Sequence, residues 1–289
     1  MRHQSPECKL VVAPWTSTGW SCSVLHLDCA QRQIAGARQD IEDVLALVER
    51  QILTKLVLRN CVALVIPDIL CQLNKLRGIE TVNSTLVEWP MTAALTSSLH
   101  PFMVSVHFRD TNLTASNFAG LLHTDLPPRM ATIGFMMSNI SALPDDVGDL
   151  WAGRFTHRFR MEQTLIGHLP PSLGRLRIKH LWLTRNRLLK ELPDDAFMNA
   201  SFERVWLSGS ALQRLPRSIG HTLKLREVFA EHTDVENLPP WLQQWHEQHV
   251  SNGHVLVSLF GSAYCTRPDR QSTLCATDMG TAELSGSID

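Results

Sequence analysis

Residues 176–193 read LRIKHLWLTRNRLLKELP, and Trp182 stands there between Leu181 and Leu183. Successive side chains of a β-strand point to opposite faces. If the two leucines are buried, the indole must point to solvent. The stretch closes on an apolar–proline step, Leu192-Pro193. We therefore expect a short strand with one apolar face, followed by a turn.

The same pattern recurs along the chain, which is the signature of a repeat protein. Alternating apolar segments lie roughly ten residues before most of the apolar–proline steps. Aligning the segments on their fourth residue gives Leu56, Ile79, Val106, Ile133, Phe159, Leu181, Val205 and Val228. The intervals are 23, 27, 27, 26, 22, 24 and 23 residues. A second apolar column two positions later and a third five positions further on, which includes Leu188, complete the predicted core.

Between the last two columns lies a polar column of small side chains. Its members are Cys61, Ser84, Thr111, Ser138, Thr164, Asn186, Ser210 and Thr233. Buried turns need partners for their backbone groups, and these side chains can supply them. We interpret Cys61 in this column as an inert core thiol.

The repeat resembles the leucine-rich-repeat family, whose pattern is LxxLxLxxNxLxxLPxxL, and the resemblance covers residues 53 to about 245. Only Asn186 places asparagine in its usual column. The resemblance implies an α/β solenoid with a curved parallel sheet on the concave face and a short helical or irregular convex side. A single repeat cannot bury its apolar side, so stacking builds the core.

Both ends of the repeat array look like covers for the sheet edges. Ile41, Val44, Leu45 and Val48 recur at helical spacing, with Asp40 as the expected N-cap. WLQQWHEQH predicts a second helix and HVLVSLF a last strand. The expected organisation is an N-terminal tail (1–14), a cap repeat (15–52), eight repeats (53–245), a C-terminal cap (246–276) and a disordered tail (277–289).

Composition excludes several classes of protein. The chain has 289 residues, 44% of them hydrophobic, and a net charge of −1, which argues against a general nucleic-acid binder. No apolar run reaches the roughly 18 residues of a membrane span. The N-terminus lacks the apolar core of a signal peptide.

The seven cysteines cluster toward the ends of the chain, which is typical of disulfide-stapled secreted proteins. We expect Cys265 to pair with Cys275, and the sequence leaves the pairing of Cys8, Cys22, Cys29 and Cys71 open. The alternative is that the cysteines are scattered buried thiols.

Motifs that would indicate catalysis are missing. There is no phosphate-binding glycine loop, nucleophile elbow, HExxH helix or C-x-x-C pair. Two carboxylate pairs, Asp145-Asp146 and Asp194-Asp195, directly follow Leu-Pro steps, where they would begin convex-side helical turns. We therefore predict no enzyme activity, no cofactor and no metal.

Four N-x-[ST] sequons make Asn83, Asn112, Asn139 and Asn199 candidate glycosylation sites. The repeat itself favours Ser and Thr near these places, which offers a coincidental explanation. Together with the cysteines, the sequons favour an extracellular or membrane-associated ectodomain. The alternative, a cytoplasmic location, is favoured by the missing signal peptide.

Alternation predicts a solvent-facing stripe on the second half of the concave face. It comprises Arg158, Arg160, His180, Trp182, Arg185, Arg204, Trp206 and Phe229. Aromatic and arginine side chains are enriched in binding hot spots. The alternative is an aromatic ladder that merely stiffens the sheet.

Charge suggests what this stripe binds. Residues 154–190 hold nine Lys or Arg and one acidic residue, so the segment carries +8. We therefore expect a protein, peptide or glycan ligand with anionic character, bound by a receptor-like domain. The alternative is an intracellular scaffold or regulatory subunit that uses the same surface.

Overall fold

A computed structural model of the chain describes residues 7–12, 21–152, 157–194, 198, 202–219, 224–249, 256–267 and 273–275. The chain divides into two compact units, which are described separately. Unit 1 contains the described residues up to Ile140, and unit 2 contains those from Ser141 onward. The expected tail at 277–289, most of the expected N-terminal tail and Asn199 lie outside the described residues.

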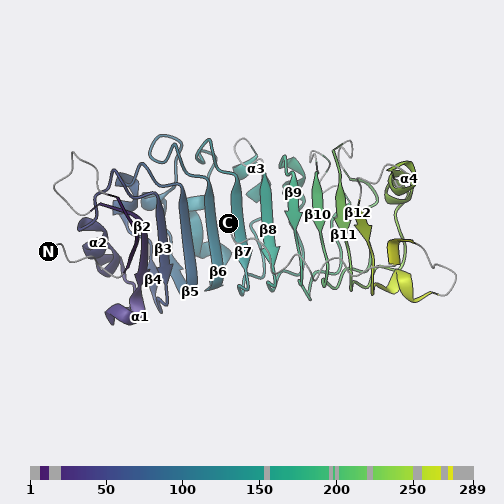
Figure 1. The fold of residues 1–289 in the computed structure, drawn as a ribbon, viewed down its shortest axis with the longest axis horizontal. Coiled ribbons are helices and arrows are strands. Elements are labelled where there is room, and N and C mark those ends of the chain that lie inside the picture. The colour runs from purple at the N-terminus through teal and green to yellow at the C-terminus, as the bar shows by residue number, and fades with distance from the viewer. Residues whose placement is uncertain are drawn as a thin grey trace. The chain divides into compact units, whose positions relative to one another are not determined.

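Unit 1 is built on a sheet with strand order β1-β2-β3-β5-β6-β7 (Figure 1). β1 is antiparallel to β2, and every later neighbouring pair on this path is parallel. The strands are β1 (Cys8–Val11), β2 (Cys22–Asp28), β3 (Lys55–Arg59), β5 (Gly78–Glu88), β6 (Ser105–Asn112) and β7 (Thr132–Met136), with the short β4 (Leu64–Val65) paired to β5. The helical segments are α1 (Cys29–Arg32), α2 (Arg38–Ala46), η1 (Asp68–Gln72), η2 (Met91–Ala93) and η3 (Ala115–Leu121).

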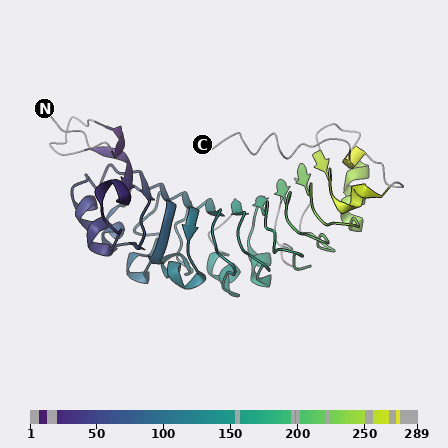
Figure 2. The ribbon, with the colours of Figure 1, turned by 90° about the horizontal axis from the view of Figure 1, so that it is seen from below.

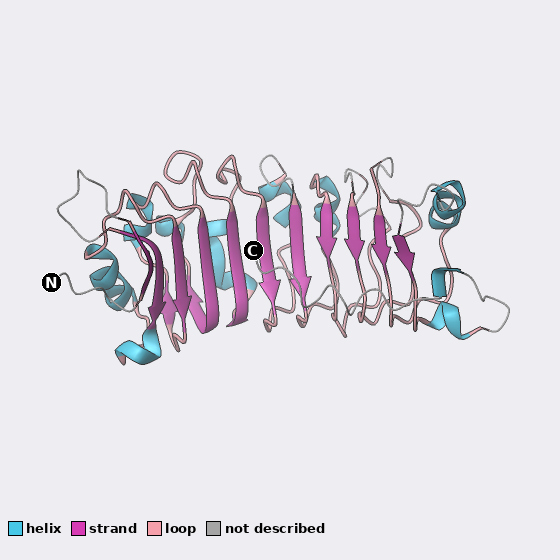
Figure 3. Cartoon of the chain, viewed as in Figure 1, coloured by secondary structure: helices cyan, strands magenta, loops and turns pink. Residues whose placement is uncertain are grey.

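Unit 2 continues the same plan with shorter strands, all parallel, in the order β8-β9-β10-β11-β12. They are β8 (Arg158–Glu162), β9 (His180–Trp182), β10 (Arg204–Trp206), β11 (Glu227–Phe229) and β12 (Leu256–Ser258). The helical segments are α3 (Val147–Trp151), η4 (Pro171–Arg175), α4 (Pro240–His249), η6 (Ala263–Thr266) and η8 (Thr273–Cys275). In each unit the strands line one side of the repeats and the helical or irregular segments line the other (Figures 2 and 3).

Strand pairing confirms the register predicted from the repeats. In unit 1, Leu56 lies opposite Ile79, and Val106 lies opposite both Ile79 and Ile133. In unit 2, Phe159, Leu181, Val205 and Val228 pair in the same consecutive manner. All eight aligned residues are buried, so each strand contributes one side chain to a continuous row in its unit.

The polar column also behaves as predicted, because all eight of its members are buried. Ser84 Oγ accepts a hydrogen bond from the backbone N–H of Cys61 in the preceding repeat, at 3.1 Å. Asn186 Oδ1 accepts from the N–H of Thr164 at 2.9 Å, and Asn186 Nδ2 donates to Met161 O at 2.8 Å. These side chains therefore satisfy the turn backbone between neighbouring repeats.

Leu188 corrects one prediction of the core. Its side chain is 53% exposed, whereas Leu189 is fully buried. The interval from Leu181 to Val205 is one residue longer than the next, and the extra residue falls after Asn186. Leu189 therefore takes the place that regular spacing assigned to Leu188.

The N-terminal cap differs from expectation in one detail. Helix α2 starts after Ala37, so Asp40 is the third helical residue and not the N-cap. Its carboxylate accepts hydrogen bonds from the backbone N–H groups of Gly36 and Ala37, at 3.1 and 3.0 Å. Asp40 therefore caps the helix from inside its first turn. The expected helical residues Ile41, Val44, Leu45 and Val48 are all buried.

Cysteine pairing corrects the interpretation of Cys61, which is not a free thiol. It forms a disulfide with Cys29, and both side chains are fully buried. Two further disulfides join Cys8 to Cys22 and Cys265 to Cys275, which leaves Cys71 as the free cysteine. The Cys29–Cys61 bond ties the segment after β2 to the turn after β3.

Aromatic side chains form a cluster inside unit 1. Phe108 stacks on Phe135 with ring centroids 5.1 Å apart and planes 9° from parallel. Trp89 and Phe118 lie 6.2 and 6.0 Å from Phe108, and all four side chains are fully buried. The three long repeat intervals fall in this part of the chain, where the larger repeats enclose larger side chains.

Candidate functional site on the sheet face of unit 2

The solvent side of β8–β11, which we call the sheet face, brings most of the predicted stripe together. Strand register places Arg160 beside Trp182, Trp182 beside Trp206, and Trp206 beside Phe229. A parallel row two residues earlier runs Arg158, His180, Arg204 and Glu227. Arg185 lies just beyond β9 in a turn with φ of 59°, and its side chain is exposed.

Trp182 and Trp206 form the aromatic centre of this face. Their ring centroids lie 4.4 Å apart with planes tilted by 59°, and both residues are partly exposed. The His180 imidazole stacks on Trp182 at 5.5 Å, and the Arg204 guanidinium lies 5.9 Å from the Trp206 ring centroid. The face therefore presents a preformed platform of rings with a cation beside it.

Phe229 was expected to be exposed, and the structure corrects this. The residue is only 5% exposed, although it occupies the predicted position in β11. The strand is not an edge, because β12 pairs with it and sets Ser258 beside Phe229. The accessible aromatic platform therefore consists of the two tryptophans alone.

Carboxylates neutralise much of the basic stripe. Arg160 donates to Glu162 at 2.9 Å, and Arg204 forms an ion pair with Glu227 at 3.3 Å. Glu203 lies 3.8 Å from Lys179 Nζ. Among the residues that the structure describes, no ion pair involves Arg158 or Arg185. The face is thus mixed in charge, with unpaired cations at its margins.

His180 is uncharged at neutral pH. Burial lowers the pKa of His180 to about 4, against the opposing effect of Glu203, whose carboxylate lies 3.7 Å from Nε2. Arg158, Arg204 and Lys179 lower the pKa of this imidazole further. The ring therefore packs on Trp182 as a neutral, hydrogen-bonding group.

Three buried polar atoms of β8 and β9 have no hydrogen-bond partner within the described part of the chain. They are Arg160 Nε, Glu162 Oε1 and His180 Nδ1. A buried polar atom without a partner is costly, so native proteins seldom leave several together. All three atoms are shielded from solvent, so they are packed within the face and are not presented on its surface.

Glu203 is the member of the site that sequence reasoning missed. It occupies the same repeat position as Lys179, two residues before the aligned Val205 and Leu181. Opposite charges at equivalent positions of neighbouring strands attract. Comparing that column between the two repeats would have found the pair.

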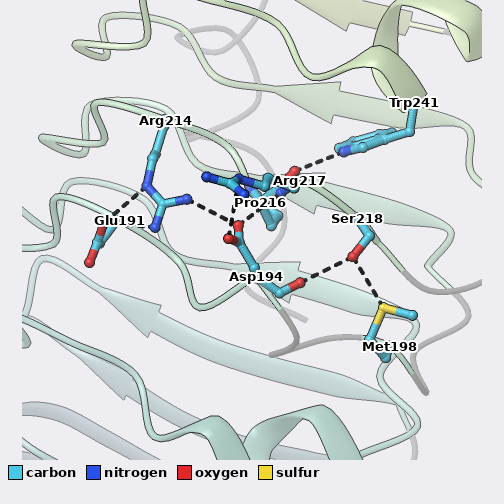
Figure 4. A network of polar contacts seen from close by, with 8 residues as sticks. All are labelled: Glu191, Asp194, Met198, Arg214, Pro216, Arg217, Ser218 and Trp241. Carbon is cyan, nitrogen blue, oxygen red and sulfur yellow. Dashed lines mark hydrogen bonds and ion pairs between the residues drawn. The ribbon is translucent and has the colours of Figure 1, made fainter.

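The two carboxylate pairs lie at a helix start and in a hydrogen-bond network between repeats. Asp146 immediately precedes α3, as expected for a helix start. Asp194 instead accepts a 3.0 Å hydrogen bond from the backbone N–H of Arg217 and another from Arg214 (Figure 4). The Arg217 N–H, followed by Arg214, holds the pKa of Asp194 below its usual range. Asp195 lies outside the described residues.

The network around Asp194 connects three successive segments of unit 2. Arg214 also donates to Glu191 at 3.0 Å, and Ser218 Oγ donates to the carbonyl of Asp194 at 3.3 Å. Trp241, in α4, donates from Nε1 to Pro216 O at 2.9 Å (Figure 4). These contacts explain Asp194 as a clamp between repeats, with no substrate required.

Three of the sequon asparagines are described, and all three side chains are exposed. Asn83 Nδ2 donates to Asn60 Oδ1 at 2.9 Å, and Asn139 Nδ2 donates to Asn112 Oδ1. The fourth, Asn199, falls outside the described residues. Within the described ranges, no helix has the length and apolar character that a membrane crossing requires.

The repeat register, the parallel sheet and the buried polar column define a leucine-rich-repeat fold. Several solved leucine-rich-repeat structures are similar to this chain. The leucine-rich-repeat domain of the type III effector XopL is 17% identical, with a TM-score of 0.50, covering 66% of this chain. The chain spans 65% of that domain's length.

Two further leucine-rich-repeat structures are more distant. A protein from Bacteroides eggerthii is 15% identical with a TM-score of 0.46, covering 65% of this chain and 32% of that one. A protein from Leptospira interrogans is 14% identical with a TM-score of 0.33, covering 80% and 74%. No protein-family model matches the sequence, and no curated protein matches it.

Proposed function

We propose that the chain is a non-catalytic recognition protein that binds a protein or peptide through the sheet face of unit 2. The observation that carries this proposal is the partly exposed Trp182–Trp206 pair, with the Arg204 guanidinium beside it. Tryptophan and arginine are the residues most enriched among binding hot spots. An aromatic ladder that only stiffens the sheet would explain the rings, but not the exposed arginines, Arg158 and Arg185, at the margins of the same face.

Charge indicates how the partner would be oriented. Arg160 and Arg204 are already paired, so they contribute hydrogen-bond geometry more than net charge. Arg158 and Arg185 are exposed at the margins of the face. We expect acidic groups of the partner to contact these two arginines and an apolar or aromatic group to cover the tryptophans.

A double substitution, Trp182→Ala with Trp206→Ala, tests the proposal. Peptides selected on the wild-type chain from a phage-displayed random library should bind the variant at least about 100-fold more weakly, since hot-spot truncations cost about 2 kcal/mol or more each. Affinity is measured by calorimetry, with circular dichroism to verify the fold. Leu188→Ala serves as a control, because it removes an exposed apolar side chain elsewhere in unit 2. Unchanged affinity in the double variant would contradict the proposal.

We further propose that the protein works in an extracellular or otherwise oxidising setting. Three disulfides support this, because such bonds are rare in reducing compartments. An intracellular scaffold using the same face is the competing function, and it requires the same six cysteines to be reduced.

Alkylation of the protein recovered from its natural source separates the two settings. Six of the seven cysteines are paired and Cys71 is free, so denatured protein should take up one alkyl group before reduction and seven after it. Mass spectrometry gives the count directly. Uptake of seven groups without a reductant would place the chain in a reducing compartment.

A further inference from the structure

A groove lies at the carboxyl ends of the strands of unit 1. Its volume is about 590 Å³, within the usual range for small-molecule sites. Two rows of mostly polar side chains line it, each row contributed by successive repeats. The first row includes Asn60, Asn83 and Asp110, and the second includes Thr85, Asn112 and Asn139.

Backbone geometry accounts for the first row. Asn60, Asn83 and Asp110 have φ values of 56°, 46° and 47°. Asparagine and aspartate tolerate this left-handed conformation better than most residues. The second row lies two residues further on, where the backbone makes no such demand. The Asn139 amide of this row serves the turn, because its Oδ1 accepts from the backbone N–H of Leu113 at 2.7 Å. The Thr85 hydroxyl and the Asn112 amide have no such role.

The lining side chains keep unused hydrogen-bonding capacity. An amide group has two N–H donors and an oxygen with two lone pairs. Asn112 uses only its oxygen, as the acceptor for Asn139, and Asn83 uses only one N–H, which it donates to Asn60. Among the described residues, no side-chain hydrogen bond or ion pair involves the Asp110 carboxylate, whereas its backbone belongs to β6. The groove therefore offers both donors and acceptors along its length.

The backbone at this edge is already occupied. The N–H groups of Asn60, Ala63 and Thr85 donate to Val82 O, Ala35 O and Cys61 O, at 3.0, 2.9 and 2.8 Å. An extended peptide could not add as a strand here, because such binding depends on free backbone groups. Recognition must come from side chains.

The groove is nearly neutral and partly apolar. Asp110 is the one ionisable side chain among the residues that line it. Val62 and Met137, which also line it, are 73% and 48% exposed. A polyanion would meet the Asp110 carboxylate, whereas hydroxyl groups act as donor and acceptor together and match amides. C–H surfaces of the same ligand could cover Val62 and Met137.

We propose that this groove binds a neutral saccharide, through the amides of Asn83, Asn112 and Asn139 and the carboxylate of Asp110. The site is independent of the proposed protein-binding face. A glycan attached to one of the sequon asparagines would occupy the same space, so the test uses protein made in a bacterial host without N-glycosylation.

The experiment begins with an array of neutral, sialylated and sulfated oligosaccharides. The strongest neutral binder is then titrated by calorimetry into the wild-type protein and into variants. Asn112→Leu, which removes an amide of the second row, should weaken binding at least about tenfold. Thr85→Arg, which extends a long side chain into the groove, should do the same. Gln39→Leu replaces an exposed amide on α2 and should leave the affinity unchanged.

Several outcomes would overturn the groove proposal. They are the absence of any neutral binder, binding that survives both groove substitutions in folded protein, binding restricted to anionic sugars, and competition by the phage-selected peptides. Loss of saccharide binding in the Trp182→Ala, Trp206→Ala variant would also overturn it, by moving the sugar to the sheet face. Retained saccharide binding in that variant, with loss of the peptides, would support both proposals separately.

Discussion

Replacing Gly148 with alanine should lower the free energy of unfolding by about 3 kcal/mol or more, the upper part of the range for overpacking a core. Gly148 lies in α3 and is buried. A Cβ atom there would overlap the carbonyl of Ser172 in η4 and lie 2.7 Å from the backbone nitrogen of Leu173. The backbone of η4 cannot move aside as a flexible side chain would. Urea titration of wild type and variant measures the difference.

Gly167 provides the matched control for this substitution. It also belongs to unit 2, and the nearest atom to its added Cβ is Leu188 O, at an ordinary 3.9 Å. Gly167→Ala should therefore change stability by less than about 1 kcal/mol, with a slight gain from a less flexible unfolded chain. Equal stabilities of the two variants would show that α3 does not pack closely on η4.

Asn186→Ala should also destabilise strongly, by about 3 kcal/mol, because it strands several buried groups. The substitution removes the acceptor of the Thr164 N–H and Thr164 Oγ1, at 2.9 and 2.8 Å. It also removes the donor to Met161 O. Each buried polar group left without a partner costs about 1–3 kcal/mol. Chemical denaturation checks the value.

Two further variants define the cause. Asn186→Thr keeps one polar atom and matches the residue at Thr111, Thr164 and Thr233, so we expect an intermediate loss. Gln213→Ala removes an exposed amide from the next repeat and should lie within about 0.5 kcal/mol of wild type. If Asn186→Ala proved as mild as Gln213→Ala, the buried amide would not be holding the turns together.

The sequence predicted the repeat register because eight copies report the same periodicity, and an error in one copy is corrected by the others. Leu188 shows the limit of this argument. One extra residue after Asn186 changes which leucine is buried, yet adjacent leucines at 188 and 189 satisfy the pattern equally well. The sequence pattern does not tell which of the two leucines is buried, because that depends on how the side chains pack.

Other differences arise from contacts between distant residues. Cys29 and Cys61 are 32 residues apart, and the cysteine at 61 also fits a column of small polar residues, so its pairing was hidden. Alternation placed Phe229 on the solvent side of its strand, but it could not show how β12 would limit the exposure of that ring. Alternation placed Trp182 and Trp206 as solvent-facing neighbours, and the structure sets them side by side with both rings partly exposed.

Charge at the candidate site was the least predictable property. Counting residues between 154 and 190 gave a strongly basic segment. The count omitted Glu203, which lies outside that segment in sequence but beside Lys179 in space. In a solenoid, each repeat contributes only one short strand to the sheet, so most charges counted along the chain do not lie next to one another on the sheet. The net charge of the surface is found by adding the charges at equivalent positions of successive repeats.

The aromatic cluster of unit 1 affects the order in which the repeats unfold. Each repeat of a solenoid contacts only its neighbours, so local stabilities need not be equal. The ring pairs among Trp89, Phe108, Phe118 and Phe135 contribute about 0.5–1.5 kcal/mol each beyond their buried area. As denaturant rises, the repeats around β5, β6 and β7 should be the last to lose their amide protection. A partly unfolded chain would then keep only these repeats folded around their buried aromatic side chains.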